Sequence, residues 1–288
     1  MKRRGPGVAR AKVQQGVALV AVLWIVAALS ILVTGLVQTQ REEIRTASSV
    51  RARLSGDAFG QAAIQLVVQR MRAQTEVHSR LASLKVPYGG MDIQVEIQPL
   101  TGLVDLNMAP APLLAALFRI RGLLDGSAAE RVAAALVAMR EARPAGPPPR
   151  FHAPEELLAV EGIDYDVYAR LAHLVTADSR GSGRVNPLAA PPEVLLVLAG
   201  GDPALASRVA ADRDADVAGM DTTRLQVAFT DNSASSRFRF RAYVAVPDGT
   251  EVIVVRDIDI SPAAEGTAPW RTMRKHAPVI RLNQGRST

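Results

Sequence analysis

Residues 16–37 read Gly-Val-Ala-Leu-Val-Ala-Val-Leu-Trp-Ile-Val-Ala-Ala-Leu-Ser-Ile-Leu-Val-Thr-Gly-Leu-Val, and no charged residue lies between Lys12 and Arg41. An apolar helix of about 20 residues is long enough to cross the hydrocarbon core of a bilayer. The chain before this stretch is cationic, and cationic flanks stay on the cytoplasmic side of a membrane. Its charges are Lys2, Arg3, Arg4, Arg10 and Lys12. The sequence therefore predicts a membrane helix over residues 17–37, with the rest of the chain outside the cytoplasm.

The apolar stretch differs from a cleaved secretory signal peptide. Such signals have an apolar core of roughly 7–15 residues followed by a small-residue cleavage site. This run is longer and ends at Gln38-Thr39-Gln40-Arg41. Beyond it the sequence has no proline before Pro87 and repeats apolar residues on one face of a helix to about Arg72. One long helix is therefore expected to continue from the membrane into solvent.

Composition limits the chemistry of the chain. Apolar residues make up 48% of the 288 residues and aromatic residues 4%, which predicts a helix-rich core. The absence of cysteine excludes disulfides and thiolate catalysis. Five cationic residues precede the apolar stretch, so the remainder is close to neutral despite a net charge of +6 and a pI of about 10.1. The basic pI therefore indicates membrane topology rather than a nucleic-acid partner.

Three segments alternate apolar and polar residues with the period of two that half-buried strands show. The first is 91–98, and the other two, 237–246 and 250–260, flank a turn and form a predicted hairpin. Residues 279–282 predict one further strand. Between the first strand and the hairpin, residues 100–225 follow a helical pattern. The predicted fold class is α+β, with a long N-terminal helix, a small antiparallel sheet and a large all-α insert between strands.

The helical region contains an internal repeat at an offset of 81 residues. Each copy reads as a glycine turn, a short extended piece and a helix that starts at a proline, which suits a first helical turn because it lacks an N–H. A second helix is predicted after each copy, over 127–143 and 203–214, and residues 151–171 between the copies predict two more helices around a glycine turn. The repeated positions are Gly102, Val104, Asp105, Ala109, Pro110, Leu114 and Leu117, which recur as Gly183, Val185, Asn186, Ala190, Pro191, Leu195 and Leu198.

The N-terminus resembles the prepilin class of membrane proteins, because a short basic leader ends in Gly16 and an apolar helix with an amphipathic continuation follows at once. The resemblance implies cleavage after Gly16 on the cytoplasmic side, so that Val17 becomes the mature N-terminus. Most members have Glu at the fifth mature position, where this chain has Ala21. In the K-type minor pseudopilins of type II secretion that glutamate is characteristically missing.

The helical units are similar to the insert of the same K-type proteins. The stretches that carry this similarity are 102–110, 154–163 and 183–196, although Met108 and Ala189 stand where that family favours threonine. The resemblance implies a leader over 1–16, a transmembrane part over 17–37, a periplasmic helix and first strand over 38–99, an inserted helical domain over 100–225, and the remaining strands and tail over 226–288.

The function that the resemblance implies is assembly. The chain would be a non-enzymatic, single-pass protein of the bacterial inner membrane with a periplasmic body. It would cap the pseudopilus tip and help initiate assembly for the export of folded proteins. Implied partners are the I-type and J-type minor pseudopilins, other pseudopilins, the inner-membrane assembly platform and the prepilin peptidase. The resemblance also raises calcium as a ligand of the sheet domain. Asp231 and Asn232 lie near the loop in which the resemblance would place it.

Two alternatives remain open, a minor pilin of a type IV pilus and a membrane-anchored helix–hairpin–helix protein for DNA binding or uptake. DNA-binding hairpins need flanking Lys or Arg, whereas the hairpins at 121–126, 160–164 and 199–202 each bring an acid, which repels phosphate. The Arg-Phe-Arg-Phe-Arg run at 237–241 could stack single-stranded nucleic acid. Its alternation favours a strand with both phenylalanines on the long helix and the arginines in water. The sequence contains no nucleophile elbow and no pairing of a histidine with a carboxylate, so nothing in it indicates catalysis.

Overall fold

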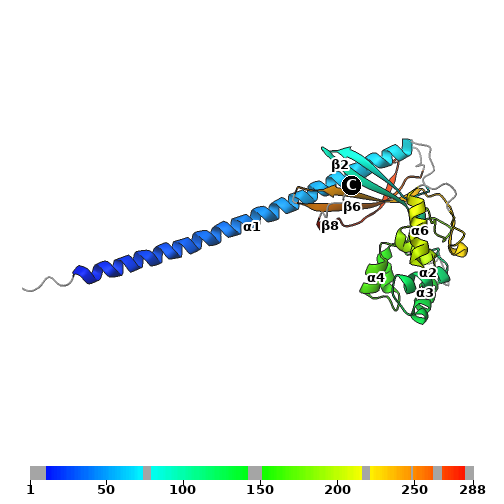
Figure 1. Ribbon diagram of the computed structural model, residues 1–288, viewed down its shortest axis with the longest axis horizontal. Helices are drawn as coiled ribbons and strands as arrows, with labels where there is room; N and C mark the ends of the chain where they lie inside the picture. The colour runs from blue at the N-terminus through cyan, green and yellow to red at the C-terminus, as the bar shows by residue number, and fades with distance from the viewer. Residues whose placement is uncertain are drawn as a thin grey trace, which may run out of the picture. The chain divides into compact units, whose positions relative to one another are not determined.

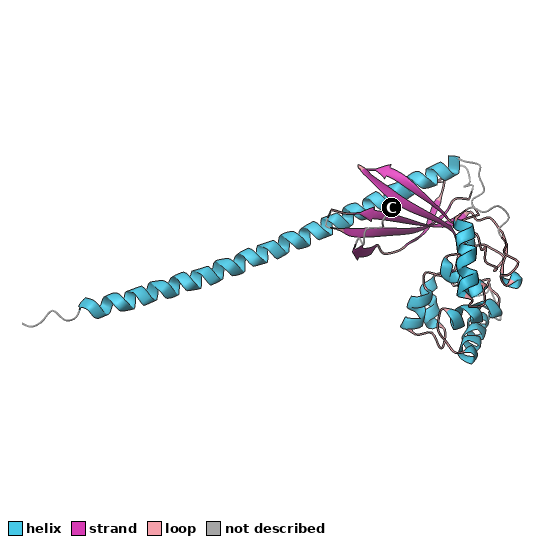
Figure 2. Cartoon of the chain, viewed as in Figure 1, coloured by secondary structure: helices cyan, strands magenta, loops and turns pink. Residues whose placement is uncertain are grey.

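The computed structural model describes residues 11–73, 79–141, 151–215, 221–247, 249–261 and 268–282. The chain divides into two compact units, residues 1–55 and 56–288. Helix α1 (Ala11–Ala73) is the first element, and it ends where the sequence predicts an end near Arg72. A β-sheet and a group of shorter helices follow it in the chain (Figures 1 and 2). The fold is α+β, as the sequence predicts.

Six strands of the second unit form one antiparallel sheet. The main path through the sheet is β1-β2-β5-β6-β7, and β8 also pairs with β6. The predicted hairpin and the predicted last strand are present, whereas the sequence pattern does not predict β1 or β7. The strands are β1 (Ala82–Tyr88), β2 (Met91–Pro99), β5 (Arg237–Ala245), β6 (Thr250–Asp259), β7 (Arg271–Lys275) and β8 (Val279–Leu282).

Strands β2 and β5 are neighbours although the whole helical region lies between them in the sequence. Ile97 is opposite Phe240, and Val95 is opposite Ala242. This register places the apolar residues of both strands on one face of the sheet, because side chains alternate between faces and directly opposed residues share one. The pairing confirms that the first predicted strand and the later hairpin belong to one sheet.

The C-terminal part of α1 packs closely on that apolar face. A Cβ added to Gly56 would lie 2.7 Å from Val252 Cγ2, and one added to Gly60 would lie 2.5 Å from Val254 Cγ2. Both distances are too short for real carbon atoms, so the two glycines let the helix backbone approach the sheet. The α1 residues buried beyond them are Ala63, Ile64, Val67, Val68 and Met71.

The helical region between β2 and β5, here called the insert, has a core of its own. Its cluster of buried apolar residues runs from Val104 to Leu225 and contains no residue of α1 or of the six-stranded sheet. The first of the two helices predicted over 151–171 is a 3₁₀ helix. The helix predicted over 127–143 is described as far as Glu141. The elements are η1 (Leu100–Gly102), β3 (Val104–Asp105), α2 (Ala111–Ile120), α3 (Gly126–Glu141), η2 (Pro154–Ala159), α4 (Tyr165–Leu171), β4 (Val175–Thr176), α5 (Pro192–Leu198), α6 (Pro203–Asp214) and η3 (Val227–Phe229).

The two copies of the internal repeat contact each other reciprocally. A Cβ on Gly102 would lie 2.1 Å from the carbonyl oxygen of Ala189, and one on Gly183 would lie 2.1 Å from that of Met108. The 81-residue offset that relates the two glycines also relates Met108 to Ala189. Contacts in which each copy presents the same position to the other indicate an approximate two-fold relation. The repeat in the sequence is therefore also a repeat in the structure.

Candidate functional site

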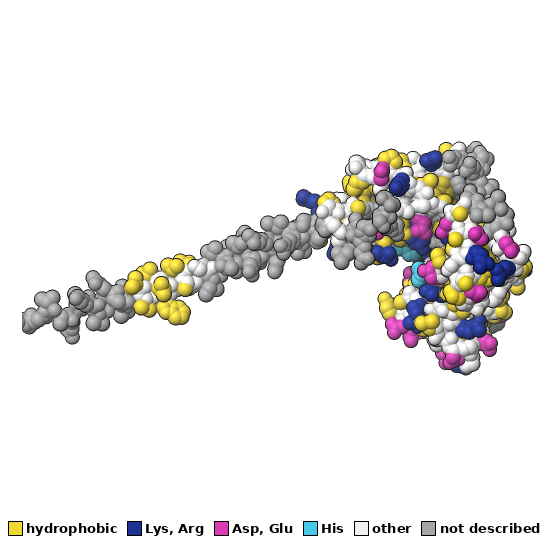
Figure 3. Space-filling model, viewed as in Figure 1, with side chains coloured by type: hydrophobic (Ala, Val, Ile, Leu, Met, Phe, Trp, Pro, Cys, Tyr) yellow, Lys and Arg dark blue, Asp and Glu magenta, His cyan; other side chains and the backbone are white. Residues whose placement is uncertain are grey.

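The described side chains of residues 19–30 form an apolar collar around α1 (Figure 3). Leu19, Leu23 and Trp24 are each at least 70% exposed, and the exposed apolar residues are not confined to one face. The hydroxyl of Ser30 donates to the carbonyl of Val26 at 2.8 Å, so this polar group has a partner within the helix. A helix that is apolar on all sides belongs in an apolar environment. The collar is therefore the first candidate functional surface.

The predicted membrane helix and its cleavage site fall partly outside the described side chains. In α1, side chains are described for residues 19–30 and 50–73. Gly16 and Val17 lie within α1, but both positions are outside these ranges. In the part of the chain that is described, no helix combines the length and the hydropathy needed to span a bilayer. The membrane span over 17–37 and the cleavage after Gly16 stay predictions.

The second face of the sheet carries the arginines that the sequence pattern places in water, and this prediction is wrong for Arg237 and Arg239. They are 5% and 3% exposed. Arg239 donates from Nε and Nη2 to the two carboxylate oxygens of Asp257 at 2.8 and 3.0 Å, and Arg237 donates from Nε to Asp259 at 3.0 Å. Buried charges need such partners. Phe238 and Phe240 alternate with the arginines and therefore lie on the opposite face of the sheet. Val244 lies on the same face as the phenylalanines, and its Cγ2 would be 3.4 Å from a Cβ added to Gly60 of α1.

The insert covers these arginines, which explains their burial. Arg237 donates to the carbonyl of Asp178 at 2.8 Å, and Arg239 to that of His173 at 3.5 Å. Arg274 of β7 donates to the carbonyl of His152 at 2.5 Å. All three acceptors belong to the insert. The insert and the sheet are thus joined by charge-assisted hydrogen bonds to backbone carbonyls.

The carboxylates of this junction titrate below their ordinary range. Burial raises the pKa of Asp257, but the hydrogen bond with His276 and the adjacent Arg239 guanidinium more than offset it, so its pKa lies well below 3.8. Burial also raises the pKa of Asp259, and its hydrogen bonds with Ser261 and Arg237 outweigh that effect and lower the pKa. Both carboxylates are therefore charged at neutral pH and neutralise the buried arginines.

An aspartate at each hairpin of the insert caps the helix that follows it. A side-chain oxygen at this position accepts hydrogen bonds from N–H groups of the first helical turn, which have no partner inside the helix. The acceptor is Oδ1 in all three, with bonds from Ala128 to Asp125 at 2.7 Å, from Val167 to Asp164 at 2.7 Å, and from Ala204 and Leu205 to Asp202 at 2.9 and 3.1 Å. These three aspartates, which the sequence sets against phosphate, therefore have a structural role as helix caps.

The glycine N–H groups of the outer hairpins are also engaged. Gly122 donates to Leu117 at 3.2 Å, and Gly201 donates to Leu196 at 2.9 Å. A phosphate at such a hairpin would need free N–H groups and a helix N-terminus without a carboxylate. The geometry thus disfavours the DNA-binding alternative.

Asp231 and Asn232, the candidates for calcium, lie in a loop stabilised by local hydrogen bonds. Asp231 Oδ1 accepts from the N–H and hydroxyl of Ser233 at 3.1 and 2.8 Å, and Oδ2 accepts from the hydroxyl of Ser182. Calcium takes six to eight oxygen ligands. Among the described residues, no group of three or more His, Cys, Asp or Glu side chains is placed to hold a metal. The described surroundings of Asp231 do not fit such a site.

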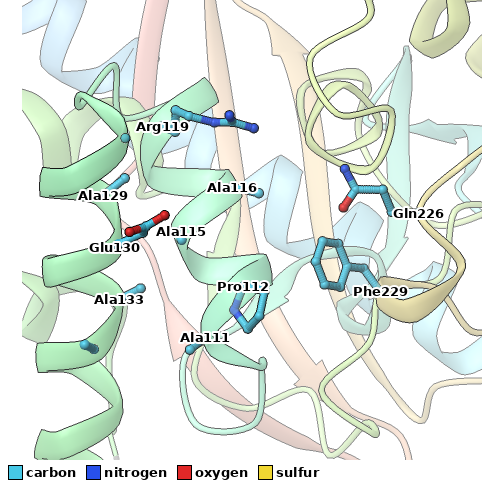
Figure 4. Close-up of a pocket in the computed structure, with 12 residues that line it drawn as sticks. Ala111, Pro112, Ala115, Ala116, Arg119, Ala129, Glu130, Ala133, Gln226 and Phe229 are labelled. Carbon is cyan, nitrogen blue, oxygen red and sulfur yellow. The ribbon is translucent and has the colours of Figure 1, made fainter.

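The insert also has a groove of about 540 Å³ across α2 and α3. Small side chains, including Ala115 and Ala133, line it, and Phe229 stands on its far side (Figure 4). Arg119 and Glu130 are its charged lining residues. Catalysis by side chains needs a nucleophile or an acid and base in mutual reach. The lining supplies contact surface rather than such a constellation.

A second cleft of about 580 Å³ lies where the insert meets the sheet, lined by Asp105, Asp178 and Arg237 among others. Asp105 is buried and accepts four hydrogen bonds, from the N–H groups of Asn107, Met108 and Ser179 and from the hydroxyl of Ser179. Four donors satisfy the carboxylate. Asp105, which stands at the polar position common to both repeats, therefore stabilises its own turn.

Sequence reasoning missed the arginine–aspartate pairs, although the hairpin register carries a signal for them. Arg237 is directly opposite Asp259, and Arg239 is directly opposite Asp257. Opposite charges facing each other across a strand pair are stabilising neighbours. An Arg-x-Arg segment whose hairpin register sets it against Asp-x-Asp indicates a paired face even when the covering element is unknown.

Comparison with solved structures gives a structural likeness, whereas the other comparisons give none. No family model matches the chain, and no curated protein matches it. A chain in the crystal structure of the GspK–GspI–GspJ complex from the type 2 secretion system of enterotoxigenic Escherichia coli is similar at 16% sequence identity and a TM-score of 0.44. The match covers 82% of this chain and 98% of that one.

Proposed function

We propose that this chain is a structural minor pseudopilin of a type II secretion system, of the K type. It is made as a precursor, cut after Gly16 by the prepilin peptidase, and anchored in the bacterial inner membrane with its body in the periplasm. It joins I-type and J-type minor pseudopilins and other pseudopilins at the assembly platform, caps the pseudopilus tip and helps initiate assembly. The observation that carries this proposal is α1, whose residues 19–30 are exposed and apolar and whose residues 56–73 pack on an antiparallel sheet.

The collar supplies the assembly contact. Its side chains pack against equivalent helices of partner subunits, first in the bilayer and then inside the filament, and small residues such as Ala27 and Ala28 permit close approach. The insert makes the body too broad for another subunit to stack above it. Ala21, in place of glutamate, agrees with a first subunit that has no predecessor to pair with. These features together support a place at the tip.

The mature protein is expected to begin at Val17. Mass spectrometry of the chain expressed with a prepilin peptidase should show loss of residues 1–16, and the same chain without the peptidase should keep them. A mature N-terminus at any other residue would contradict the prepilin assignment, because both a signal peptidase and an uncut anchor leave a different first residue.

A carboxylate in the collar is expected to abolish assembly without unfolding the body. Ile25→Asp places a charge among apolar side chains, and a charge at the centre of a membrane helix costs about 2.5–3.5 kcal/mol. Carbonate extraction of membranes and co-purification with the partner subunits measure the loss. Ile25→Leu is the matched control and should behave as the parent chain. Equal membrane retention and partner recovery for both variants would exclude the collar as the assembly surface.

The deciding experiment is co-purification with candidate I-type and J-type subunits. A stable complex supports the tip assignment, and a chain that stays monomeric with all of them speaks strongly against it. A minor pilin of a type IV pilus would be processed in the same way, so the identity of the subunits that bind separates the two systems.

A further inference from the structure

The second cleft, where the insert meets the sheet, has a polar wall whose groups are already engaged. The carboxylate of Asp105 has its four donors, two of them from Ser179 at 2.9 and 2.5 Å. The side-chain amide of Asn107 donates to the carbonyls of Phe151 and Ala177 at 2.9 and 2.8 Å. These bonds satisfy the carboxylate and use both donors of the amide. The wall is therefore a fixed frame rather than a set of free ligands.

Arg237, which also lines this cleft, has an unused donor. Its Nε pairs with Asp259 at 3.0 Å, and its Nη1 donates to the carbonyl of Asp178 at 2.8 Å and lies 3.6 Å from the Asp178 carboxylate. Nη2 has no acceptor among the described residues, and it is not one of the unpaired side-chain atoms that the chain encloses completely. The side chain is only 5% exposed overall. Nη2 is therefore open to the cleft.

Arg180 brings a second free guanidinium to the same cleft. It is exposed, and it forms no hydrogen bond or ion pair with a described residue. Its φ is +54°, a conformation that favours glycine, and the adjacent Ser179 hydroxyl fixes the turn by accepting from Gly181 N–H at 3.0 Å. The two acids of the lining, Asp105 and Asp178, have the partners given above. Arg180 thus carries the lining charge that no described group balances.

We propose that this cleft binds a carboxylate of a polypeptide, with Nη2 of Arg237 and the guanidinium of Arg180 as donors. Arginine has N–H donors and no acceptor, so both groups require acceptor oxygens. A guanidinium matches a carboxylate in geometry and charge. The single negative charge of a carboxylate balances Arg180, whereas a phosphate group carries a charge of about −2 and would leave excess negative charge beside the two acids.

Apolar side chains set what stands next to that carboxylate. Met108 is 46% exposed at the cleft, and Phe151 and Ala177 line it as well. Methionine adapts its shape to irregular apolar partners. A free small anion would leave this surface uncovered, so the ligand is a chain whose carboxylate adjoins an apolar side chain. That carboxylate belongs either to a chain end or to an acidic side chain. The site goes beyond the proposed function, because it needs no other subunit.

Isothermal titration of the full chain in detergent with capped tripeptides tests the site and separates the two sources. Acetyl-Leu-Ala-Leu with a free C-terminus presents a chain end, and its amide is the uncharged counterpart. Acetyl-Leu-Glu-Leu amide presents an acidic side chain, and the glutamine peptide is its counterpart. A charged peptide should bind about tenfold or more tightly than its uncharged counterpart, as hydrogen bonds to a charged group imply.

Arg180→Gly should weaken the binding of the charged peptide by about tenfold or more, because one of the two donor groups is removed. Glycine suits the positive φ, so the thermal midpoint should stay unchanged or rise. Arg184→Ala removes another exposed arginine, which does not line the cleft, and should bind as the parent chain. If Arg180→Gly unfolds at a lower temperature than the parent chain, Arg180→Asn replaces it, since asparagine also adopts positive φ.

Three results would overturn the proposal. The first is equal binding of charged and uncharged peptides, or no binding of either. The second is an equal loss for Arg180→Gly and Arg184→Ala, which would mean a general attraction to surface charge. The third is binding of acetate as tight as that of the peptides, which would leave an adventitious ion only. Co-purification with the other subunits is independent of all three, so their occurrence would leave the proposed function standing.

Discussion

Replacing Gly183 with alanine is expected to lower the free energy of unfolding by about 3 kcal/mol or more. Two costs add at this position. Its φ is +85°, where an L residue is strained, and the new Cβ would lie 2.1 Å from the carbonyl oxygen of Met108. Both atoms of the carbonyl are backbone, so the neighbour cannot rotate away. The reciprocal contact between the repeats would have to open, and with it the core of the insert.

Three other glycines separate the two costs. Gly102→Ala meets the carbonyl of Ala189 at 2.1 Å without a positive φ, Gly90→Ala has a φ of +79° with nothing within 4 Å, and Gly126→Ala has neither problem. Urea unfolding followed by circular dichroism should rank the losses in the order Gly183, then Gly102, then Gly90, with Gly126→Ala close to the parent chain. A Gly102→Ala variant as stable as Gly126→Ala would show that the repeats do not pack as closely as described.

The main helices and strands could be predicted because each has a signal within its own stretch of sequence. The end of α1, the β5–β6 hairpin and the start of α6 at Pro203 follow from periodicity, a turn and a proline. The pairing of β2 with β5 also followed, since a half-buried strand needs neighbours. Strand β1 was missed because it ends in Pro87 and Tyr88, directly before Gly89 and Gly90, and a proline within a run argues against a strand.

Prediction failed where the burial of a residue depends on a distant part of the chain. Alternation correctly separated the phenylalanines from the arginines of β5, but alternation cannot say what covers each face. Arg237 and Arg239 are buried because the insert, contributed by a distant part of the sequence, lies over them. The hairpin aspartates were likewise interpreted only as charges that repel phosphate. Because each stands directly before a helix, they act as helix caps. Leu123, in the turn between α2 and α3, has a φ of +61°, a backbone conformation that no local sequence pattern predicts for leucine.

Removing the carboxylate of Asp257 is expected to be the second severe change, with a loss of about 3–5 kcal/mol. Asp257→Leu leaves the guanidinium of Arg239 buried at 3% exposure without its bidentate acceptor. Arg239→Met should be similarly harmful on its own. The double variant should recover most of the loss, because a buried pair can be replaced by apolar residues of similar volume at little cost.

The more exposed pair of Arg241 and Glu96 is the matched control for this cycle. Its side chains are 19% and 26% exposed, and the ion pair spans 3.0 Å. Pairs that solvent screens contribute about 1 kcal/mol or less, so Glu96→Gln should have a small effect. Equal losses for the two pairs would mean that the insert does not shield Arg239 from water.

Lowering the pH should destabilise the parent chain in the same way as removing the buried carboxylate of Asp257 does. The pKa of Asp257 is below its ordinary value of 3.8 in the folded protein, so the folded state holds this proton less readily than the unfolded state does. The stabilisation is therefore complete above this ordinary value, which applies to the unfolded state, and is lost as the pH falls from there toward the pKa of the folded state. Asp259 shifts in the same direction and adds to the effect. The double variant, which lacks Asp257, should consequently show a shallower fall in the free energy of unfolding between about pH 5 and pH 2 than the parent chain. An unchanged slope would mean that Asp257 is not held in its charged form by Arg239 and His276.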